Sequence, residues 1–436
     1  MKNWKYLIVL ALFAVLLAAC SSGSEEGVDA VVQPTEAVDT TAPTVAPVPT
    51  DTPLPPPPSV VEVESAPTEG SAQPAEKTVW PAGQYGYGVQ IHGDATYGSP
   101  DYVASVVKNE LGMDWVKMQI KWSAVRNEGP DSDQWFIYDG TIDEVSKAGL
   151  YLMVSVVSAP EWTRAAGGEN GPPDDLNLYV DFINQLLARH GEQIDAIEVW
   201  NEQNLDREWS TAEGINPARY VEMLRMTYEA IKAYNPDIIV ISGALSPTGF
   251  NDRVTAIDDF VYLDEALAAG MLDYADCVGV HHNGYNIPPN IGFDETGALP
   301  EASTAQFRGP FDNPHHSWSF KTTLDTYAAK AQAIDPNMQL CITEFGWASS
   351  EGYDAIPETF EFAWDNTLEE QAQYIVQAYQ QMRESGYVWL TFLFNYDFGN
   401  KGWGIQDDTV PYSLVSHPDG IPRLSFAAVA NMEKIR

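Results

Sequence analysis

Two segments of the sequence run from apolar residues directly into a glutamate. Residues 197–204 read IEVWNEQN and residues 340–347 read LCITEFGW, so each run leads to a carboxylate, Glu202 or Glu344, next to aromatic residues. A pair of carboxyl groups can cleave a glycosidic bond when one donates a proton to the leaving oxygen and the other, ~5 to 5.5 Å away, attacks the anomeric carbon. Two such groups also push their pKa values apart, which helps one to keep its proton. The two glutamates predict this chemistry if the fold brings them together.

The pattern of the rest of the chain indicates the elements that would position these glutamates. From Trp80 onward, short apolar runs alternate with longer amphipathic ones, as is typical of βα units. The short runs predict eight strands, at residues 85–92, 115–121, 151–157, 196–200, 238–242, 277–281, 339–343 and 388–394. The amphipathic runs predict helices at residues 100–111, 139–148, 176–189, 217–234, 258–268, 320–334 and 368–384, and a short one after residue 424. Five glycines predict left-handed helix ends: Gly112, Gly149, Gly191, Gly270 and Gly386.

Eight βα units within residues 80–436 predict an α/β fold, the (β/α)8 TIM barrel, whose functional residues lie in the loops after the strand C-termini. Glu202 then follows the fourth strand and Glu344 the seventh, so both would face the mouth of the barrel. A doubly wound open sheet is the competing architecture. It is disfavoured because the glycines at 86 and 88 lie within a predicted strand and lack the spacing of a phosphate-binding loop.

The sequence WNE at 200–202, followed by EFGW at 344–347, resembles the clan A glycoside hydrolases, which are retaining (β/α)8 enzymes. The resemblance covers residues 80–436 and is strongest to the family 39 and family 5 types. It implies that Glu202 is the acid/base, that Glu344 is the nucleophile and that Asn201 contacts the sugar 2-hydroxyl. The clan often carries an Arg on its second strand, where this chain has Lys117 and Lys121 instead.

The sixth predicted strand leads into the sequence HHNGY at 281–285. Enzymes of the clan often place a His and a Tyr here that orient the sugar and the nucleophile. We therefore expect His281 to face the substrate, and Tyr285 or His282 to donate a hydrogen bond to Glu344. The long loop at 283–319 is rich in Pro, Gly and Asn, and we expect it to form a wall of the cleft.

Other side chains near strand ends could also contact a sugar. Rings that could stack on a sugar, or equally pack in the core, are Trp122, Trp162, Trp347 and Trp403. Asn395 and Lys121 stand where they could bind hydroxyl groups. Glu198 has the strand parity of Glu202, and we expect it to be a structural residue with Lys117 or Lys121 as its cationic partner.

No metal ion and no cofactor is predicted. The paired histidines His281-His282 and His315-His316 are the candidate ligands, but neighbours in an extended segment point in opposite directions, and no two His residues have helical ligand spacing. Cys277 and Cys341 lie near predicted strand ends and could be neighbours in the core. A disulfide and two buried thiols both fit, and two thiols are the expectation.

The N-terminus resembles a bacterial lipoprotein signal, because an apolar run after Lys2 and Lys5 ends in the lipobox-like sequence LAAC at 17–20. Residues 1–20 are thus expected to be a signal peptide, with acylation of Cys20 anchoring the protein to the cell membrane outside the cytoplasm. Residues 21–79, which are rich in Pro, Thr and acidic side chains, predict a disordered spacer before a catalytic domain at 80–436.

The charge of the chain narrows its partners. It has 62 Asp and Glu against 23 Lys and Arg, and this net charge of -39 would repel nucleic acid and disfavours strongly anionic polysaccharides. A neutral carbohydrate is therefore the expected substrate. The main alternative is a sugar-binding surface lipoprotein without catalysis, although a transport receptor would need two lobes and the βα units here run without a break.

Overall fold

The computed structural model describes residues 78–94, 98–401 and 404–436, with side chains undescribed at 400 and 401. The expected signal peptide, nearly all of the expected spacer, Cys20 and Trp403 lie outside the described residues. Within the described part, eight parallel strands form one sheet in the order β5-β4-β3-β2-β1-β8-β7-β6. The strands are β1 (Gly86–Gln90), β2 (Trp115–Lys121), β3 (Tyr151–Val157), β4 (Ala196–Val199), β5 (Ile239–Ser242), β6 (Val278–Gly284), β7 (Leu340–Trp347) and β8 (Val388–Leu393).

The two end strands of this order, β5 and β6, meet and close the sheet. Isolated parallel bridges join Ile241 to Cys277 and Leu245 to Val280. The backbone N–H of Gly279 also donates to the Ser242 hydroxyl at 3.0 Å. Glycine is required at 279, because a Cβ there would lie 2.0 Å from the Ser242 carbonyl oxygen. The predicted (β/α)8 barrel and its eight strands are confirmed.

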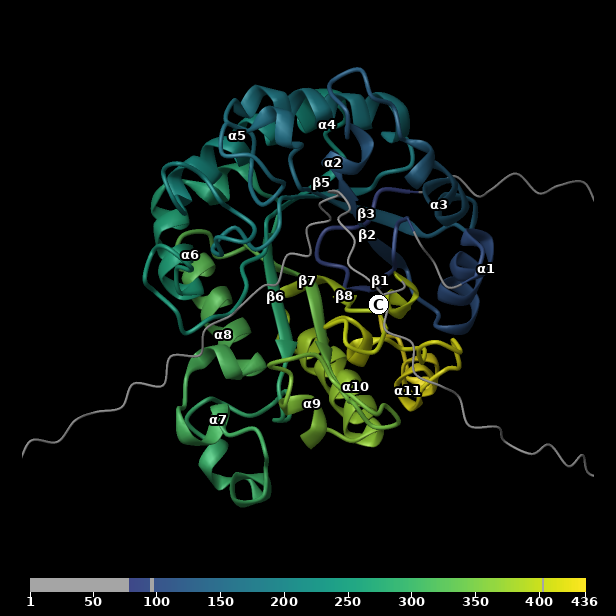
Figure 1. Ribbon diagram of the computed structural model, residues 1–436, viewed down its shortest axis with the longest axis vertical. Helices are drawn as coiled ribbons and strands as arrows, with labels where there is room; N and C mark the ends of the chain where they lie inside the picture. The colour runs from purple at the N-terminus through teal and green to yellow at the C-terminus, as the bar shows by residue number, and fades with distance from the viewer. Residues whose placement is uncertain (1–77, 95–97, 402–403) are drawn as a thin grey trace, which may run out of the picture. The chain divides into compact units, whose positions relative to one another are not determined.

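A helix follows each strand, and the helices surround the strands (Figure 1). These eight are α1 (Pro100–Ser105), α3 (Phe136–Lys147), α4 (Leu176–His190), α5 (Pro217–Tyr234), α6 (Asp259–Ala268), α8 (Phe320–Gln332), α10 (Leu368–Ser385) and α11 (Leu424–Asn431). Short helices α2 (Trp122–Val125), α7 (Gly309–Asp312) and α9 (Phe362–Asp365) lie in the loops. The predicted first helix is a short α-helix that continues as a π-helical segment, Val106–Glu110. None of the helices in the described residues is long and apolar enough to cross a membrane.

Four of the five predicted left-handed glycines have positive φ, but Gly191 does not. It has φ -60°, an ordinary right-handed value, at the end of α4. Glycine fits here because the packing is close: a Cβ at this position would lie 2.4 Å from the Tyr234 hydroxyl and 2.5 Å from the Leu187 carbonyl.

The expectation of two buried thiols is wrong, because Cys277 and Cys341 form a disulfide. Cys277 directly precedes β6, and Cys341 is the second residue of the neighbouring parallel strand β7. Their Cα atoms are 5.8 Å apart, within the range that a disulfide spans. The bond lies in an apolar cluster with Trp115, Met153 and Phe392. It therefore ties the N-terminal end of the barrel together, opposite the end where the strand C-termini meet.

The barrel interior above this apolar cluster is polar. Lys117, Ser155, Glu198 and Thr343 are all completely buried. A buried charge is costly unless an opposite charge and hydrogen bonds satisfy it. The strand sequences therefore place a charge network in the barrel, directly beneath the loops that carry Glu202.

Candidate active site

Glu202 stands in a tight turn just after β4. Trp200 and Glu202 both have positive φ, 76° and 43°, which is uncommon for residues other than glycine and is found at functional sites. The turn is held because Trp200 Nε1 donates to the Glu208 carbonyl at 2.9 Å and Glu202 N donates to the Ala244 carbonyl at 2.8 Å. Asn201 is buried, and its Oδ1 accepts from Gln119 Nε2 at 3.3 Å. The turn therefore fixes Asn201 and Glu202 beside each other at the barrel mouth.

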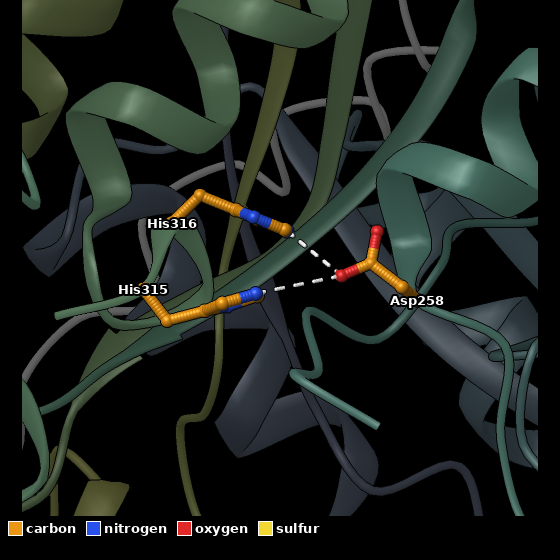
Figure 2. Close-up of side chains that lie close together, drawn as sticks. All are labelled: Asp258, His315 and His316. Carbon is orange, nitrogen blue, oxygen red and sulfur yellow. Dashed lines mark ion pairs between the residues drawn. The ribbon is translucent and has the colours of Figure 1, made fainter. Parts of the chain in front are cut away.

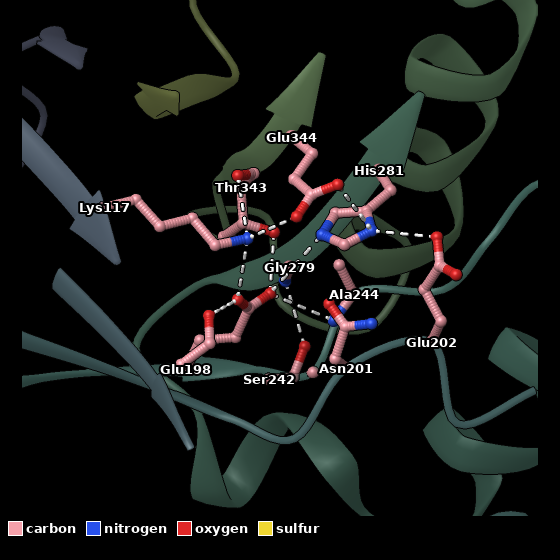
Figure 3. Close-up of polar contacts among 12 residues, drawn as sticks. Lys117, Glu198, Asn201, Glu202, Ser242, Ala244, Gly279, His281, Thr343 and Glu344 are labelled. Atoms are coloured by element: carbon pink, nitrogen blue, oxygen red, sulfur yellow. Dashed lines mark hydrogen bonds and ion pairs between the residues drawn. The ribbon is translucent and has the colours of Figure 1, made fainter. Parts of the chain in front are cut away.

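Glu344 reaches the same place from β7, and His281 from β6 lies between the two glutamates (Figure 3). His281 Nδ1 is 3.2 Å from Glu202 Oε1 and 3.9 Å from Glu344 Oε2. The side chains of Glu202 and Glu344 are 13% and 9% exposed, so both are shielded from bulk water yet reachable. Glu202 and Glu344 are therefore brought together, as the sequence predicts, although Glu344 lies within β7, which continues to Trp347 instead of ending at 343.

Lys117 on β2 connects the nucleophile candidate with the interior of the barrel. Its Nζ is 3.0 Å from Glu344 Oε1 and 3.3 Å from Glu198 Oε2, and it also donates to the Thr343 carbonyl at 3.1 Å. Burial alone would lower the pKa of Lys117, but the two glutamates outweigh burial and raise it. Lys117 is thus a buried cation shared between two carboxylates, one of them in the site.

Glu198 has Lys117 as its cationic partner, one of the two partners that the sequence predicts. Burial would raise its pKa, but Lys117 and His281 lower the pKa below its ordinary value. Its carboxylate also accepts from the Ser155 hydroxyl, from the Thr343 hydroxyl at 2.6 Å and from the Ala244 N–H at 3.3 Å. With every lone pair direction used, Glu198 serves to hold Lys117 in place beneath Glu344.

Arg207 controls the charge of Glu202 in this conformation. Its Nη2 lies 2.7 Å from Glu202 Oε2, while its own side chain is 60% exposed. Burial would raise the pKa of Glu202, but Arg207 and His281 lower it to about 2. A second carboxyl group in the same loop behaves in the opposite way, because burial and the charge of Glu202 raise the pKa of Glu208 to about 8.

The carboxylates around His281 favour the charged form of its ring. Burial would lower its pKa, but Glu344 and Glu202 outweigh burial and raise it.

Neither Arg207 nor Glu208 was singled out from the sequence. The available signal was their position, since both fall within six residues of Glu202 in the loop 200–210 that follows β4.

Of the remaining residues that were predicted to contact substrate, some are buried and others are exposed. Trp347 is wholly buried, and its Nε1 donates to the Ile287 carbonyl at 3.0 Å, so the predicted sugar stacking is wrong for this residue. Trp122 is also buried, stacked on Phe182. Asn395 is completely buried and uses its amide within the β8 loop, so it does not face a sugar either. These residues support the loops around the site from below.

Two other predicted contacts, His282 and Tyr285, lie in apolar surroundings. His282 is buried against Phe320, 5.6 Å between ring centroids, and burial lowers its pKa to about 3, so it is a neutral packing residue. Tyr285 packs in an aromatic cluster with Trp318, at 4.6 Å, and Phe362, at 5.0 Å. No hydrogen bond from His282 or Tyr285 to Glu344 is found among the described residues. The expected donors to this carboxylate are replaced by Lys117.

Trp162 and Lys121 keep exposed side chains and so remain available to a ligand. Trp162 is 39% exposed, with its Nε1 donating to the Arg126 carbonyl at 2.9 Å. Lys121 ends β2 and is exposed to solvent. The other group of side chains with ligand chemistry in the described residues is a cluster of two histidines and an aspartate outside this site, Asp258, His315 and His316.

No protein-family model and no curated protein matches the sequence. Among solved structures, the chain is similar to a family 39 glycoside hydrolase from the gut symbiont Bacteroides cellulosilyticus WH2, with 18% identity and a TM-score of 0.56 over 80% of this chain and 62% of that one. It is also similar to a monomeric beta-xylosidase from Caulobacter crescentus CB15, with 18% identity and a TM-score of 0.53 over 79% and 67% of the two chains. A glucosidase from Croceicoccus marinus gives 14% identity and a TM-score of 0.54 over 80% and 65%. The chain thus shares the (β/α)8 fold of these enzymes while spanning under two thirds of the length of the first.

Proposed function

We propose that this protein is a retaining glycoside hydrolase in which Glu344 is the nucleophile and Glu202 is the acid/base. The observation that carries the proposal is the meeting of both carboxylates on one histidine, with His281 Nδ1 3.2 Å from Glu202 and 3.9 Å from Glu344. Because each carboxylate lies within 4 Å of the same nitrogen, the pair is near enough for the ~5 to 5.5 Å spacing of retaining enzymes. The barrel fold shared with known glycosidases supports the same reaction class.

In the first step Glu344 attacks the anomeric carbon while Glu202 protonates the leaving oxygen. Lys117 contacts Glu344 Oε1 at 3.0 Å, so it orients the carboxylate and leaves Oε2 as the oxygen to attack. In the second step Glu202 removes a proton from water, which releases the sugar from Glu344 with net retention. We propose that Asn201 binds the 2-hydroxyl as the ring flattens, and its fixed position next to Glu202, with Oδ1 accepting from Gln119, supports this role.

The first step requires a proton on Glu202, and the ion pair with Arg207 opposes it. Because Arg207 is largely exposed, a substrate entering next to Glu202 can displace it, which removes the main charge that keeps Glu202 ionised. Once Glu344 has been esterified, its negative charge is gone and Glu202 returns to the ionised form that the second step needs. The surrounding charges therefore support a change of role between the two steps.

A fluorinated glycosyl inhibitor would test this function. The wild-type chain should gain the mass of one glycosyl group on Glu344, located by peptide mass spectrometry, whereas Glu344→Gln should gain none. Glu229→Gln is the control, because it removes an exposed carboxylate from an ion pair on α5, and it should be labelled like the wild type. Labelling that persists in Glu344→Gln would refute Glu344 as the nucleophile. No labelling of the wild type, together with no turnover of any β-glucan, xylan, mannan or aryl glycoside, would favour a binding protein without catalysis.

We also propose that the substrate is a neutral carbohydrate, because the net charge of -39 would repel strongly anionic polysaccharides. We further propose that Cys20 is acylated and anchors the protein outside the cytoplasm. The lipobox-like sequence supports this, and so does the disulfide, since such bonds persist in oxidising compartments. Metabolic labelling with a fatty-acid analogue should mark the wild-type protein, and label retained by Cys20→Ala would contradict the anchor.

A further inference from the structure

Asp258, His315 and His316 form a compact cluster (Figure 2). Asp258 precedes α6, and the two histidines end the long segment between β6 and α8. Asp258 Oδ2 lies 3.7 Å from His315 Nε2 and 3.6 Å from His316 Nε2. One ligand atom from each residue lies within 4.8 Å of the others. Three potential ligands from two different loops therefore face one point.

The expectation that adjacent histidines point in opposite directions is wrong at this site. His315 is extended, with φ -148°, but His316 begins a 3-10 turn, His316–Trp318. The change of backbone conformation between the two turns both rings to the same side, and their centroids are 4.1 Å apart. The alternation on which the expectation rested holds only while the chain stays extended.

The separations fit a tetrahedral metal ion. Metal–ligand bonds of ~2.0 to 2.2 Å at tetrahedral angles put neighbouring ligand atoms ~3.4 Å apart, close to the observed 3.6 and 3.7 Å. A hydrogen bond would be shorter than these two contacts. Two imidazoles and one carboxylate are a ligand set that suits Zn²⁺ and related ions and not Ca²⁺ or Mg²⁺, which prefer oxygen ligands alone.

The surroundings of the cluster also fit ligation. Asp258 uses Oδ1 to cap α6, accepting from the N–H groups of Phe260 at 3.0 Å and Val261 at 3.2 Å, which leaves Oδ2 for another partner. His315 Nδ1 accepts from the Ser317 backbone N–H at 3.3 Å and lies 3.0 Å from the Ser317 hydroxyl, and these contacts fix the orientation of the ring with Nε2 toward Asp258. The side chains are partly accessible, 12% for Asp258, 33% for His315 and 11% for His316, so an ion can enter.

Asp259 provides a second carboxylate at the same point. Its Oδ1 is 2.9 Å from His316 Nε2, and its Oδ2 accepts from the Tyr327 hydroxyl at 3.2 Å. An ion bound to His316 Nε2 would take the place of the proton in the first of these contacts. Asp259 would then be an adjacent anion, held by Tyr327, that can complete the coordination.

We propose that Asp258, His315 and His316 bind one divalent transition-metal ion such as Zn²⁺, and that the ion pins the β6–α8 segment to the start of α6. The cluster lies in the loops after β5 and β6, so the ion would hold a wall of the barrel mouth. No role in bond cleavage is assigned to it, and the proposal stands independently of the glycosidase function.

Isothermal titration of the full, chelator-treated protein with ZnCl₂ would test the site. One equivalent of Zn²⁺ should bind to the wild type, and His315→Gln and Asp258→Asn should each weaken binding by ~100-fold or more, beyond the 10- to 100-fold typical of outer-shell changes. Asn caps a helix as well as Asp does, so Asp258→Asn keeps α6 intact while removing the anionic ligand. His417→Gln, which removes a partly exposed imidazole outside the cluster, should bind like the wild type.

Limited proteolysis would test the pinning. Zn²⁺ should slow cleavage within residues 285–319 in the wild type and in His417→Gln, but not in Asp258→Asn or His315→Gln. Absence of stoichiometric binding, or equal binding by the wild type and both ligand variants, would overturn the site. Binding that leaves the cleavage rate unchanged would overturn the structural role.

Discussion

His281 Nδ1 contacts Glu202 Oε1 at 3.2 Å and also lies 3.9 Å from Glu344 Oε2, so one imidazole connects the glutamates of two opposing strands. Its Nε2 lies 3.9 Å from Glu198 Oε1, so three carboxylates surround one ring. Because these carboxylates raise the pKa of His281 and favour its charged form, the ring reduces the repulsion among them and fixes their orientation. His281 is thus expected to be a positioning residue for both catalytic groups.

Replacing His281 with Gln should lower kcat/KM by about 100-fold, because small misplacements of reacting groups have effects of this size. The loss should appear mainly in kcat. His282→Gln is the matched control, since its ring packs on Phe320 and has no contact with either glutamate among the described residues. That control should lower the melting temperature but leave the pH profile of the folded enzyme unchanged. Equal kinetics for His281→Gln and the wild type would remove His281 from the site.

Replacing Arg207 with Gln should extend activity to higher pH. Glu202 donates only when protonated, and Arg207 helps to hold its pKa at about 2, so kcat/KM should fall as pH rises above that value. Without Arg207 the pKa of Glu202 rises, and the fall should move to higher pH by about one unit, a modest shift because the arginine is exposed. The measurement is the pH dependence of kcat/KM on an unactivated disaccharide.

Two controls separate this effect from a general loss of structure. Aryl glycosides whose leaving groups need no proton should show little change in Arg207→Gln. Arg225→Gln removes an exposed helical ion pair with Glu229 and should leave every profile as in the wild type. Identical disaccharide profiles for the wild type and Arg207→Gln would show that Arg207 does not set the charge of Glu202.

The two glutamates of this site could be predicted from the sequence, but the depth at which each side chain lies in the barrel could not. Lys117 and Lys121 have the same strand parity, so both are compatible with an inward direction from β2. Only the three-dimensional positions show that Lys117 is level with Glu198, whereas Lys121 ends the strand in solvent. The same limit applies to Trp347, whose position at a strand end indicates a sugar contact although the loop above it buries the ring.

Contacts between segments that are distant in the chain could not be predicted from the sequence either. The periodicity of apolar residues specifies each strand and helix locally, which is why the eight strands could be predicted. The Cys277–Cys341 disulfide depends on the register between β6 and β7, and the Asp258–His315–His316 cluster depends on a single change of backbone conformation. Neither the register nor the turn leaves a pattern in the sequence.

Replacing Lys117 with Met should destabilise the fold by about 3 to 5 kcal/mol, because it leaves buried Glu198 and Glu344 without their cation. Urea unfolding would measure the change, with the exposed Lys121→Met as the control. Adding Glu198→Gln should restore part of the stability by removing one unpaired charge. It should not restore glycosyl trapping, because Glu344 still lacks its partner. A double variant with wild-type trapping would show that Lys117 acts on folding alone.

Replacing both cysteines with Ala should lower the free energy of unfolding by up to about 4 kcal/mol, the loop-entropy value for a crosslink across 64 residues. The bond lies at the N-terminal end of the barrel, among Trp115 and Met153, whereas the proposed catalytic Glu202 follows β4 and Glu344 lies in the C-terminal half of β7. The variant should therefore unfold at lower urea and still hydrolyse substrate at the wild-type rate below its transition. If the rate of the folded variant fell together with its stability, the two ends of the barrel would be coupled. The disulfide would then contribute to activity and not to stability alone.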